Sequence, residues 1–347
     1  TGHLLEEANL SRQTNEVSDC MRFYEYMQAP GIDVLCENNM EFDTAKQVSS
    51  VANQFNRKWR LSETYGCTDW DFSFEGHKAI SDWQVALGIN LRCQHLSWYT
   101  MEGEAKRDYP AGIFYQSPWW EQYSKVEDYF ARAHVLMSQG KEVRDLLVIH
   151  PIESMWLKVK KDWRASDETK RLDESIAHIR NELLREHIDF DYGNEVILSR
   201  HASVTKRGFV VKHAAYKAIV VPPMLTIRST TLKLIERFRA TGGTVVFVGE
   251  PAGLVDATPS NAVRDLAARC VRVSDIKDLP AAVDADARRV SIADPRGQEI
   301  RPALYCLRED ADNYYLFIAN TSINEKEAEC WTDRKSTRLN SSHGKLS

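Results

Sequence analysis

The chain has 347 residues, of which 43% are hydrophobic and 27% are charged. This composition argues against a disordered or fibrous protein, and the length suits two or three domains. The 45 Lys and Arg residues and 50 Asp and Glu residues give a net charge of −5, so a nucleic-acid binder that relies on a global basic field is excluded. No run of about 18 apolar residues occurs, and we expect no membrane span.

Both ends of the sequence look incomplete or foreign. The chain opens at Thr1, without Met and inside a strand-like pattern, which predicts an N-terminal truncation. The compartment therefore stays open between a bacterial cytoplasm and periplasm or secretion. Residues 333–347 resemble the translation of a sequencing adapter, and we exclude them from the predicted fold. Seven scattered cysteines without a C-x-x-C spacing argue against a disulfide framework and a zinc ribbon.

Residues 1–140 alternate short apolar runs with helical patterns. The predicted strands start about 30 residues apart, which is the length of a strand–helix unit. Four such units make the C-terminal half of an eight-stranded (β/α)8 barrel. The strands are expected at 3–5, 32–35, 59–62 and 89–94, and the helices at 18–27, 45–55, 77–87 and 123–139.

Residues 141–285 predict a second α/β domain with a Rossmann-like parallel sheet. Its strands are expected at 145–151, 218–223 and 244–249, and its helices at 173–186 and 229–241. Gly242 suits the position just after a helix end. The acidic stretch 189–193 is interpreted as a solvated loop. Residues 286–332 alternate apolar and polar side chains, which is typical of half-buried antiparallel strands, and they predict the start of a truncated β-sandwich-like domain.

Tryptophan is concentrated between residues 70 and 120, where five of the nine in the chain occur among acidic and basic side chains. An aromatic face can stack on the apolar face of a sugar, while charged groups bond its hydroxyls. A packing patch between domains is the alternative interpretation. The tryptophans predicted to bind substrate are Trp70, Trp98, Trp119 and Trp120.

Carboxylates follow several predicted strands, and in a (β/α)8 barrel these strand ends build the active site. Glu63 ends the third strand, Glu37 follows the second, and Glu6 or Glu7 follows the first. A glycosidase needs two carboxylates that flank the scissile bond. Glu63 is therefore the predicted catalytic residue, although a turn or helix-terminal carboxylate would fit the same position.

Two further side chains are candidates for substrate contact. His95 ends the fourth predicted strand, where it could touch substrate, orient a carboxylate or sit in the core as a satisfied polar group. Arg107 lies in the predicted loop 106–110, which could present a cation to a substrate oxygen or form a solvated salt bridge.

Several short motifs together resemble the C-terminal half of a (β/α)8 glycoside hydrolase, similar to the α-L-rhamnosidase-type barrels. They occur in the order Ser49–Ala52, Ser62–Gly66, Asp82-Trp83, Gly88–Asn90, His95 and Ser117–Trp120. The resemblance implies that Glu63 is the nucleophile or general base and that the partner acid lies on a strand before Thr1. The present fragment would then be inactive by itself. Members of this type can hold calcium near the site, which would make Glu37 a candidate ligand, but a single Glu has no ligand-spacing signature.

The second domain resembles the amidotransferase-like module that follows the barrel in many such hydrolases. It lacks a nucleophilic Cys after strand 245–249, and the chain has no G-x-S-x-G, G-x-G-x-x-G or P-loop motif. We interpret the module as structural or oligomer-forming, which leaves a homo-oligomer open.

The expected protein is thus a glycoside hydrolase that cleaves plant or microbial glycans. Its expected partner is a carbohydrate substrate, with no nucleic acid, no membrane, no required cofactor and no predicted metal ligands. The alternatives are a carbohydrate-binding protein with a degenerate barrel and an amidotransferase-like enzyme. The missing nucleophile counts against the latter.

Overall fold

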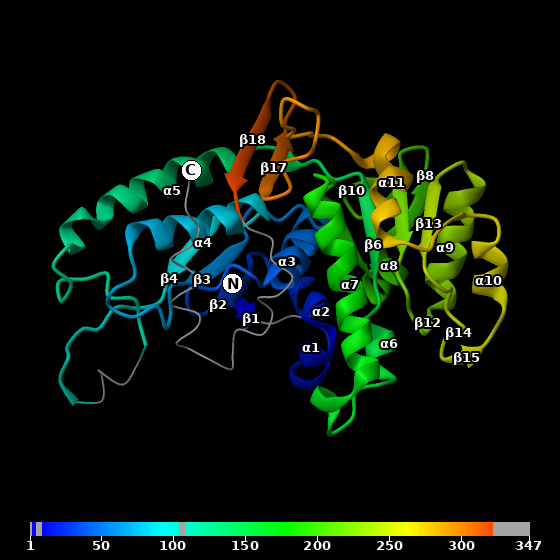
Figure 1. The fold of residues 1–347 in the computed structure, drawn as a ribbon, viewed down its shortest axis with the longest axis horizontal. Helices are drawn as coiled ribbons and strands as arrows, with labels where there is room; N and C mark the ends of the chain where they lie inside the picture. The colour runs from blue at the N-terminus through cyan, green and yellow to red at the C-terminus, as the bar shows by residue number, and fades with distance from the viewer. Residues whose placement is uncertain (1, 5–8, 104–108, 322–347) are drawn as a thin grey trace.

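The computed structural model describes residues 2–4, 9–103 and 109–321. Two parallel sheets lie side by side, and a small antiparallel sheet lies over their junction (Figure 1). One hydrophobic cluster contains side chains from both parallel sheets, for example Ile32 and Val148. The domain boundaries predicted at residues 140 and 285 stay predictions, and the one at residue 332 lies outside the described residues. Within the described residues, none of the helices is long and apolar enough to cross a bilayer.

The first sheet has four parallel strands in the order β1-β2-β3-β4. The four predicted strands are confirmed, and the helices between them agree with the predicted strand–helix alternation. The strands are β1 (Gly2–Leu4), β2 (Pro30–Val34), β3 (Leu61–Thr64) and β4 (Leu91–Gln94). The helices are α1 (Leu10–Glu16), α2 (Cys20–Tyr24), α3 (Phe42–Gln54), α4 (Phe74–Ala86), the 3-10 turn η2 (Trp120–Tyr123) and α5 (Ser124–Met137). That this sheet is half of a closed barrel stays a prediction.

The second sheet has five parallel strands in the order β16-β13-β11-β6-β7. Numbered along the chain, this is the doubly wound order 2-1-3-4-5. Its strands are β6 (Leu146–His150), β7 (Phe190–Asn194), β11 (Ala218–Val221), β13 (Thr244–Val248) and β16 (Val271–Val273). Its helical segments are α6 (Ile152–Trp156), η3 (Trp163–Ala165), α7 (Asp167–Arg185), α8 (Glu195–His201), α9 (Ser229–Ala240), α10 (Ala262–Ala267), η4 (Ile276–Asp278) and α11 (Leu279–Ala287). Gly242 follows α9 with φ +90°, as predicted.

The remaining strands form three small sheets. The predicted antiparallel strands near the C-terminus are confirmed as β17 and β18, and β5 joins them across the junction. The bounds are β5 (Lys141–Glu142), β17 (Ala303–Glu309) and β18 (Tyr314–Asn320). The other two sheets combine β8 (Ala202–Thr205), β9 (Gly208–Val211) and β10 (Ala214–Tyr216), and β12 (Thr226–Ile227), β14 (Leu254–Val255) and β15 (Thr258–Pro259).

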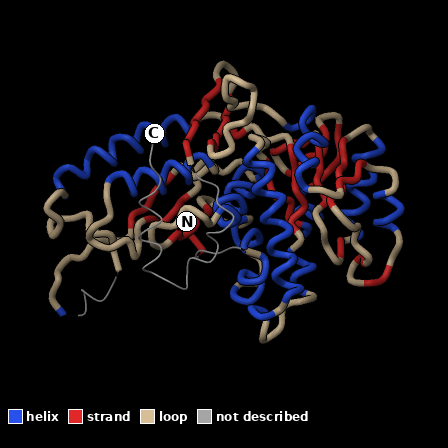
Figure 2. Tube along the Cα trace, in the orientation of Figure 1, coloured by secondary structure: helices blue, strands red, loops and turns tan. Residues whose placement is uncertain are grey.

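Helix α3 joins the two parallel sheets. All thirteen of its residues are buried, because it contacts β2 on one side and β7 on the other. Figure 2 shows helices between the strands of the two parallel sheets. Polar residues of α3 therefore need partners, and Gln54 Nε2 donates to the carbonyl oxygen of Tyr192 at 2.9 Å.

The interpretation of residues 189–193 as a solvated loop is wrong. They lead into and form most of β7, and Asp189 and Asp191 are buried. Lys46 Nζ lies 2.5 Å from Asp189 Oδ1, and Arg144 contacts Asp189 Oδ2 at 2.8 Å and Asp191 Oδ1 at 2.7 Å. Buried carboxylates are tolerated when cations and hydrogen bonds compensate them, and here the cations come from distant parts of the chain.

Glu195 at the start of α8 makes the stability of the fold depend on pH. Burial raises the pKa of Glu195 to about 7, although its Oε2 accepts a hydrogen bond from Arg228 N at 2.7 Å. The pKa of an unfolded Glu is about 4.3, so the folded protein binds this proton more tightly than the unfolded chain. The stabilisation that comes from binding the proton is therefore complete below the pKa of the unfolded Glu, and it is lost as the pH rises through about 7.

Glu195→Gln is accordingly expected to stabilise the protein at pH 8 by up to about 3 kcal/mol, with little effect at pH 4. Urea unfolding across this pH range measures the difference. Glu236→Gln is the matched control, since Glu236 lies on α9 with a partly exposed carboxylate. If the difference in unfolding free energy between the Glu195 variant and the parent did not grow with pH, the raised pKa of Glu195 would be contradicted.

Candidate active site

Glu63 lies on the third strand of the first sheet, next to another carboxylate. In the strand register it pairs with Asp33 on β2 and with Cys93 on β4. Side chains at paired positions of parallel strands point to the same face, and adjacent strands are about 4.8 Å apart. The neighbours Ser62 and Thr64 are buried on the opposite face, while Glu63 is partly exposed. Glu63 and Asp33 therefore lie side by side on one face of the sheet.

The loop after β3 is held by Tyr65, which is fully buried. Its hydroxyl accepts a hydrogen bond from Arg92 Nη1 at 2.7 Å and lies 2.5 Å from Ser81 Oγ. Burial raises the pKa of Tyr65, so it stays neutral. Tyr65, Cys67 and Asp69 all have positive φ values, between +62° and +69°. Left-handed backbone at residues other than Gly is uncommon and is concentrated at functional sites, so this loop fits an active-site edge.

His95 lies directly after β4 and against this loop. Its backbone nitrogen donates to Thr64 O at 3.0 Å, and its ring nitrogen Nδ1 lies 3.1 Å from Leu96 O. A Cβ on Gly66 would come within 3.0 Å of Leu35 Cδ2 and 3.2 Å of His95 Cδ2. A larger residue at position 66 would therefore push the His95 ring away from the loop by a few tenths of an ångström.

Two of the predicted tryptophans come together at the same edge. Trp70, from the β3–α4 loop, stacks on Trp98, from the loop after β4, with ring centroids 4.7 Å apart and planes 17° apart. Trp70 stays 38% exposed. A Cβ on Gly112 would lie 2.7 Å from the Trp70 ring, so Gly112 permits the close packing behind it. The pair offers an aromatic surface near the carboxyl ends of β3 and β4.

The other two tryptophans lie away from this pair. Trp119 packs edge-on against Phe74 of α4, with centroids 5.1 Å apart, in the outer helical layer. Trp120 packs against Phe114 at 5.9 Å and is 40% exposed. The geometry thus gives Trp119 a packing role between α4 and α5.

The remaining candidates are placed as follows. Glu37 lies in the turn after β2 and is partly exposed. Glu6, Glu7 and Arg107 lie outside the described residues. In the described part of the chain, no group of three or more His, Cys, Asp or Glu side chains is arranged to hold a metal ion.

Asp33 was missed in the sequence. It is 5% exposed and lies inside β2, whereas the sequence pattern directed attention to Glu37 beyond the strand end. The signal in the sequence that could have identified it is the tripeptide Ile32-Asp33-Val34. Successive side chains of a strand point to opposite faces of the sheet. Since Ile32 and Val34 belong to the core under the helices, Asp33 faces away from the helices.

The carboxyl edge of the second sheet is where ligands bind in open α/β folds. Elements of the first sheet cover part of this edge. Asn194 at the end of β7 donates from Nδ2 to Asp19 Oδ2 at 2.7 Å, and Trp156 donates from Nε1 to Ser18 O at 3.0 Å. The α1–α2 segment is thus docked where a ligand of the second domain would approach.

These features are consistent with a glycoside hydrolase barrel-like fold, and comparison with solved structures supports this fold. The structure is similar to a rhamnosidase from Novosphingobium sp. PP1Y, with a TM-score of 0.62, 18% identity, and coverage of 86% of this chain and 30% of the rhamnosidase. It is also similar to the exo-carrageenase GH42 from Bacteroides ovatus, with a TM-score of 0.52, 13% identity, and coverage of 85% of this chain and 40% of that one. The predicted resemblance to rhamnosidase-type glycoside hydrolases is confirmed for the fold.

One curated protein has a similar sequence. It is named "Putative beta-glucuronidase", comes from Formosa agariphila, and is 31% identical over 129 residues, which are 35% of this chain and 11% of that protein. No family model matches the chain. The chain spans well under two thirds of the length of each of these relatives.

Proposed function

We propose that this protein hydrolyses O-glycosidic bonds of plant or microbial glycans, with Glu63 as one of the two catalytic carboxylates. The observation that carries the proposal is the position of Glu63 on the face of the sheet away from the helices, at the carboxyl edge and beside Asp33. A carboxylate there can attack the anomeric carbon or activate a water molecule. Glycosidase neighbours share the fold.

Asp33 acts in this proposal as a positioning residue. Its side chain is nearly inaccessible, so a bound sugar reaches Glu63 first. Trp70 and Trp98 supply an aromatic surface on which a sugar ring can stack, and His95 approaches the loop that follows Glu63. Glu37, Trp120 and Arg107 stay proposed substrate contacts, whereas for Trp119, which was predicted as one, we propose a packing role against Phe74 instead. The second domain stays a proposed structural or oligomer-forming module.

Hydrolysis of a panel of aryl glycosides by the product of the full-length reading frame tests the proposal. The panel should include rhamnosides and glucuronides, because two of the relatives are named for these sugars. Release of the aryl group from one sugar would support a glycosidase and identify the sugar. Binding of a sugar without hydrolysis of any glycoside would contradict the proposal and favour a carbohydrate-binding protein.

The two tryptophan environments predict different effects of truncation. Trp98→Ala removes half of the aromatic surface and is expected to raise KM by about tenfold with little change in kcat. Trp119→Ala is expected to lower thermal stability while leaving KM unchanged, because Trp119 packs on Phe74. Steady-state kinetics and a thermal melt of both variants measure this. Equal effects of the two variants on KM would contradict the placement of the sugar at the Trp70–Trp98 pair.

A further inference from the structure

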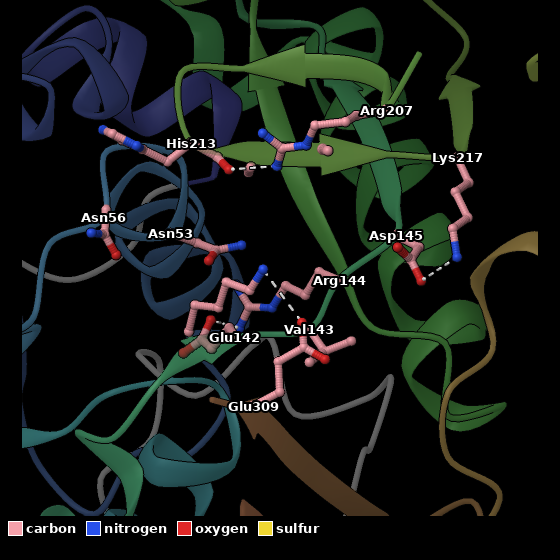
Figure 3. A pocket seen from close by; sticks show the side chains of 13 residues that line it. Asn53, Asn56, Glu142, Val143, Arg144, Asp145, Arg207, His213, Lys217 and Glu309 are labelled. Carbon is pink, nitrogen blue, oxygen red and sulfur yellow. Dashed lines mark hydrogen bonds and ion pairs between the residues drawn. The ribbon is translucent and has the colours of Figure 1, made fainter. Parts of the chain in front are cut away.

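A cavity with a volume of about 290 Å³ lies at the amino ends of β6 and β11. Figure 3 shows the side chains that line it. Asn53 and Asn56 come from the end of α3, Arg144 and Asp145 precede β6, and Lys217 precedes β11. Since parallel strands place their catalytic groups at the carboxyl ends, this cavity is separate from the candidate active site.

The charged residues that line the cavity carry one more positive than negative charge. Four of them are cationic, Lys141, Arg144, Arg207 and Lys217, and three are carboxylates, Glu142, Asp145 and Glu309. Beneath the cavity, Arg144 is held by ion pairs to Glu142, Asp189 and Asp191. An excess of positive charge around a cavity attracts an anion.

The rim of the cavity adds one cationic side chain, Arg207, that is not paired with a carboxylate among the described residues. Its two acids are already engaged, because Asp145 pairs with Arg289 and Lys217, and Glu309 lies 3.4 Å from Lys141. The Arg207 guanidinium, by contrast, donates only to the backbone oxygen of His213, at 3.4 Å, among the described residues. Figure 3 shows Arg207 and the His213 backbone on one wall of the cavity, across from Arg144 and Glu142.

We propose that this cavity binds a small molecule that carries an oxyanion, held by the Arg207 guanidinium among the cationic side chains that line the cavity. A guanidinium can bind a carboxylate, sulfate or phosphate group through two parallel hydrogen bonds. The volume is near the lower end of about 300–1,000 Å³ that is typical of small-molecule sites, which limits the ligand to roughly the size of a monosaccharide acid. No Trp, Tyr or Phe is among the described residues that line the cavity, so a neutral sugar has no stacking surface there.

The bound ligand would contact segments that are far apart in the sequence. The cavity is formed by residues of α3, by the segment before β6, by the turns around β9 and by the end of β17. An oxyanion bound there would neutralise the excess charge at the junction and stabilise the packing of the sheets. This role is independent of the proposed hydrolysis.

Isothermal titration calorimetry tests the proposal on the whole chain. Sodium sulfate, sodium phosphate and sodium glucuronate are titrated at pH 7 and constant ionic strength, with glucose as the neutral probe. We expect at least one anion to bind with a Kd below about 1 mM and glucose not to bind. The identity of the tightest anion distinguishes an inorganic ion from a sugar acid.

Two variants locate the binding. Arg207→Gln is expected to weaken binding at least tenfold, and Ala215→Leu, which fills the cavity without changing charge, to abolish it. Arg237→Gln is the control, because Arg237 is exposed on α9 outside the cavity, and it should change Kd less than twofold. Absence of binding of all three anions, or equal weakening by Arg207→Gln and Arg237→Gln, would overturn the proposal.

Discussion

Glu63→Gln is expected to lower kcat by at least about 1,000-fold on the glycoside that the protein hydrolyses, with little change in KM. Glutamine keeps the size of the side chain but cannot supply a negative charge or accept a proton. The loss therefore falls on the transition state, in which the carboxylate forms a bond to the sugar or deprotonates a water molecule. Steady-state kinetics on the best substrate of the aryl glycoside panel measure it.

The control for this variant is Glu75→Gln, because Glu75 is an exposed glutamate in the first turn of α4. Its kcat should stay within about twofold of the parent value. Asp33→Asn is expected to lower kcat by about 10- to 100-fold and to change the pH profile of kcat/KM, as a positioning carboxylate next to Glu63 would. An unchanged kcat in Glu63→Gln would contradict the assignment of Glu63 and would indicate a catalytic carboxylate at a different strand end.

Arg144→Ala is expected to lower the free energy of unfolding by about 3–5 kcal/mol. Arg144 is 1% exposed and bonds Asp189, Asp191 and Glu142 at 2.7–2.8 Å. Burial alone would raise the pKa of Asp189, but the charges of Arg144 and Lys46 outweigh it and hold that pKa below its usual value. Without Arg144, Asp191 would keep no ion pair and Asp189 would keep only that with Lys46 among the described residues, so these buried carboxylates would have to take up protons or become exposed to water.

Urea unfolding followed by tryptophan fluorescence measures this loss. Arg144→Lys keeps the positive charge but lacks the planar guanidinium group that bonds several carboxylates at once, so it should be less destabilising than Arg144→Ala. Arg237→Ala, an exposed arginine on α9, should change the free energy of unfolding by less than about 0.5 kcal/mol. A loss below about 1 kcal/mol for Arg144→Ala would show that the network does not depend on this residue.

Local patterns were enough to predict much of the fold. The apolar runs that became β2, β6 and β13 are buried strands of parallel sheets, and the helix that ends before Gly242 was recognised from its apolar spacing and its terminal glycine. Both kinds of signal depend on residues within a few positions of one another. They can be recognised without knowledge of the rest of the chain.

The candidate site was predicted in part for the same reason. Glu63 was recognised because a carboxylate at a strand end is visible locally, and its place on the sheet agrees with that expectation. Trp70 and Trp98 were selected by composition, but so was Trp119, which packs against Phe74 in the helical layer. Which tryptophans meet depends on how the loops after β3 and β4 fold back, and the spacing of aromatic residues does not encode that.

The sequence by itself determined the alternation of strands and helices, the resemblance to glycoside hydrolases and the position of Glu63 at a strand end. Only the tertiary structure decided that Asp33 lies beside Glu63 and that Asp189 and Asp191 are buried rather than solvated. The physical reason is that an acidic side chain is stable in a protein interior only if cations reach it. Here the cations are Lys46, 143 residues from Asp189, and Arg144, 45 residues from it.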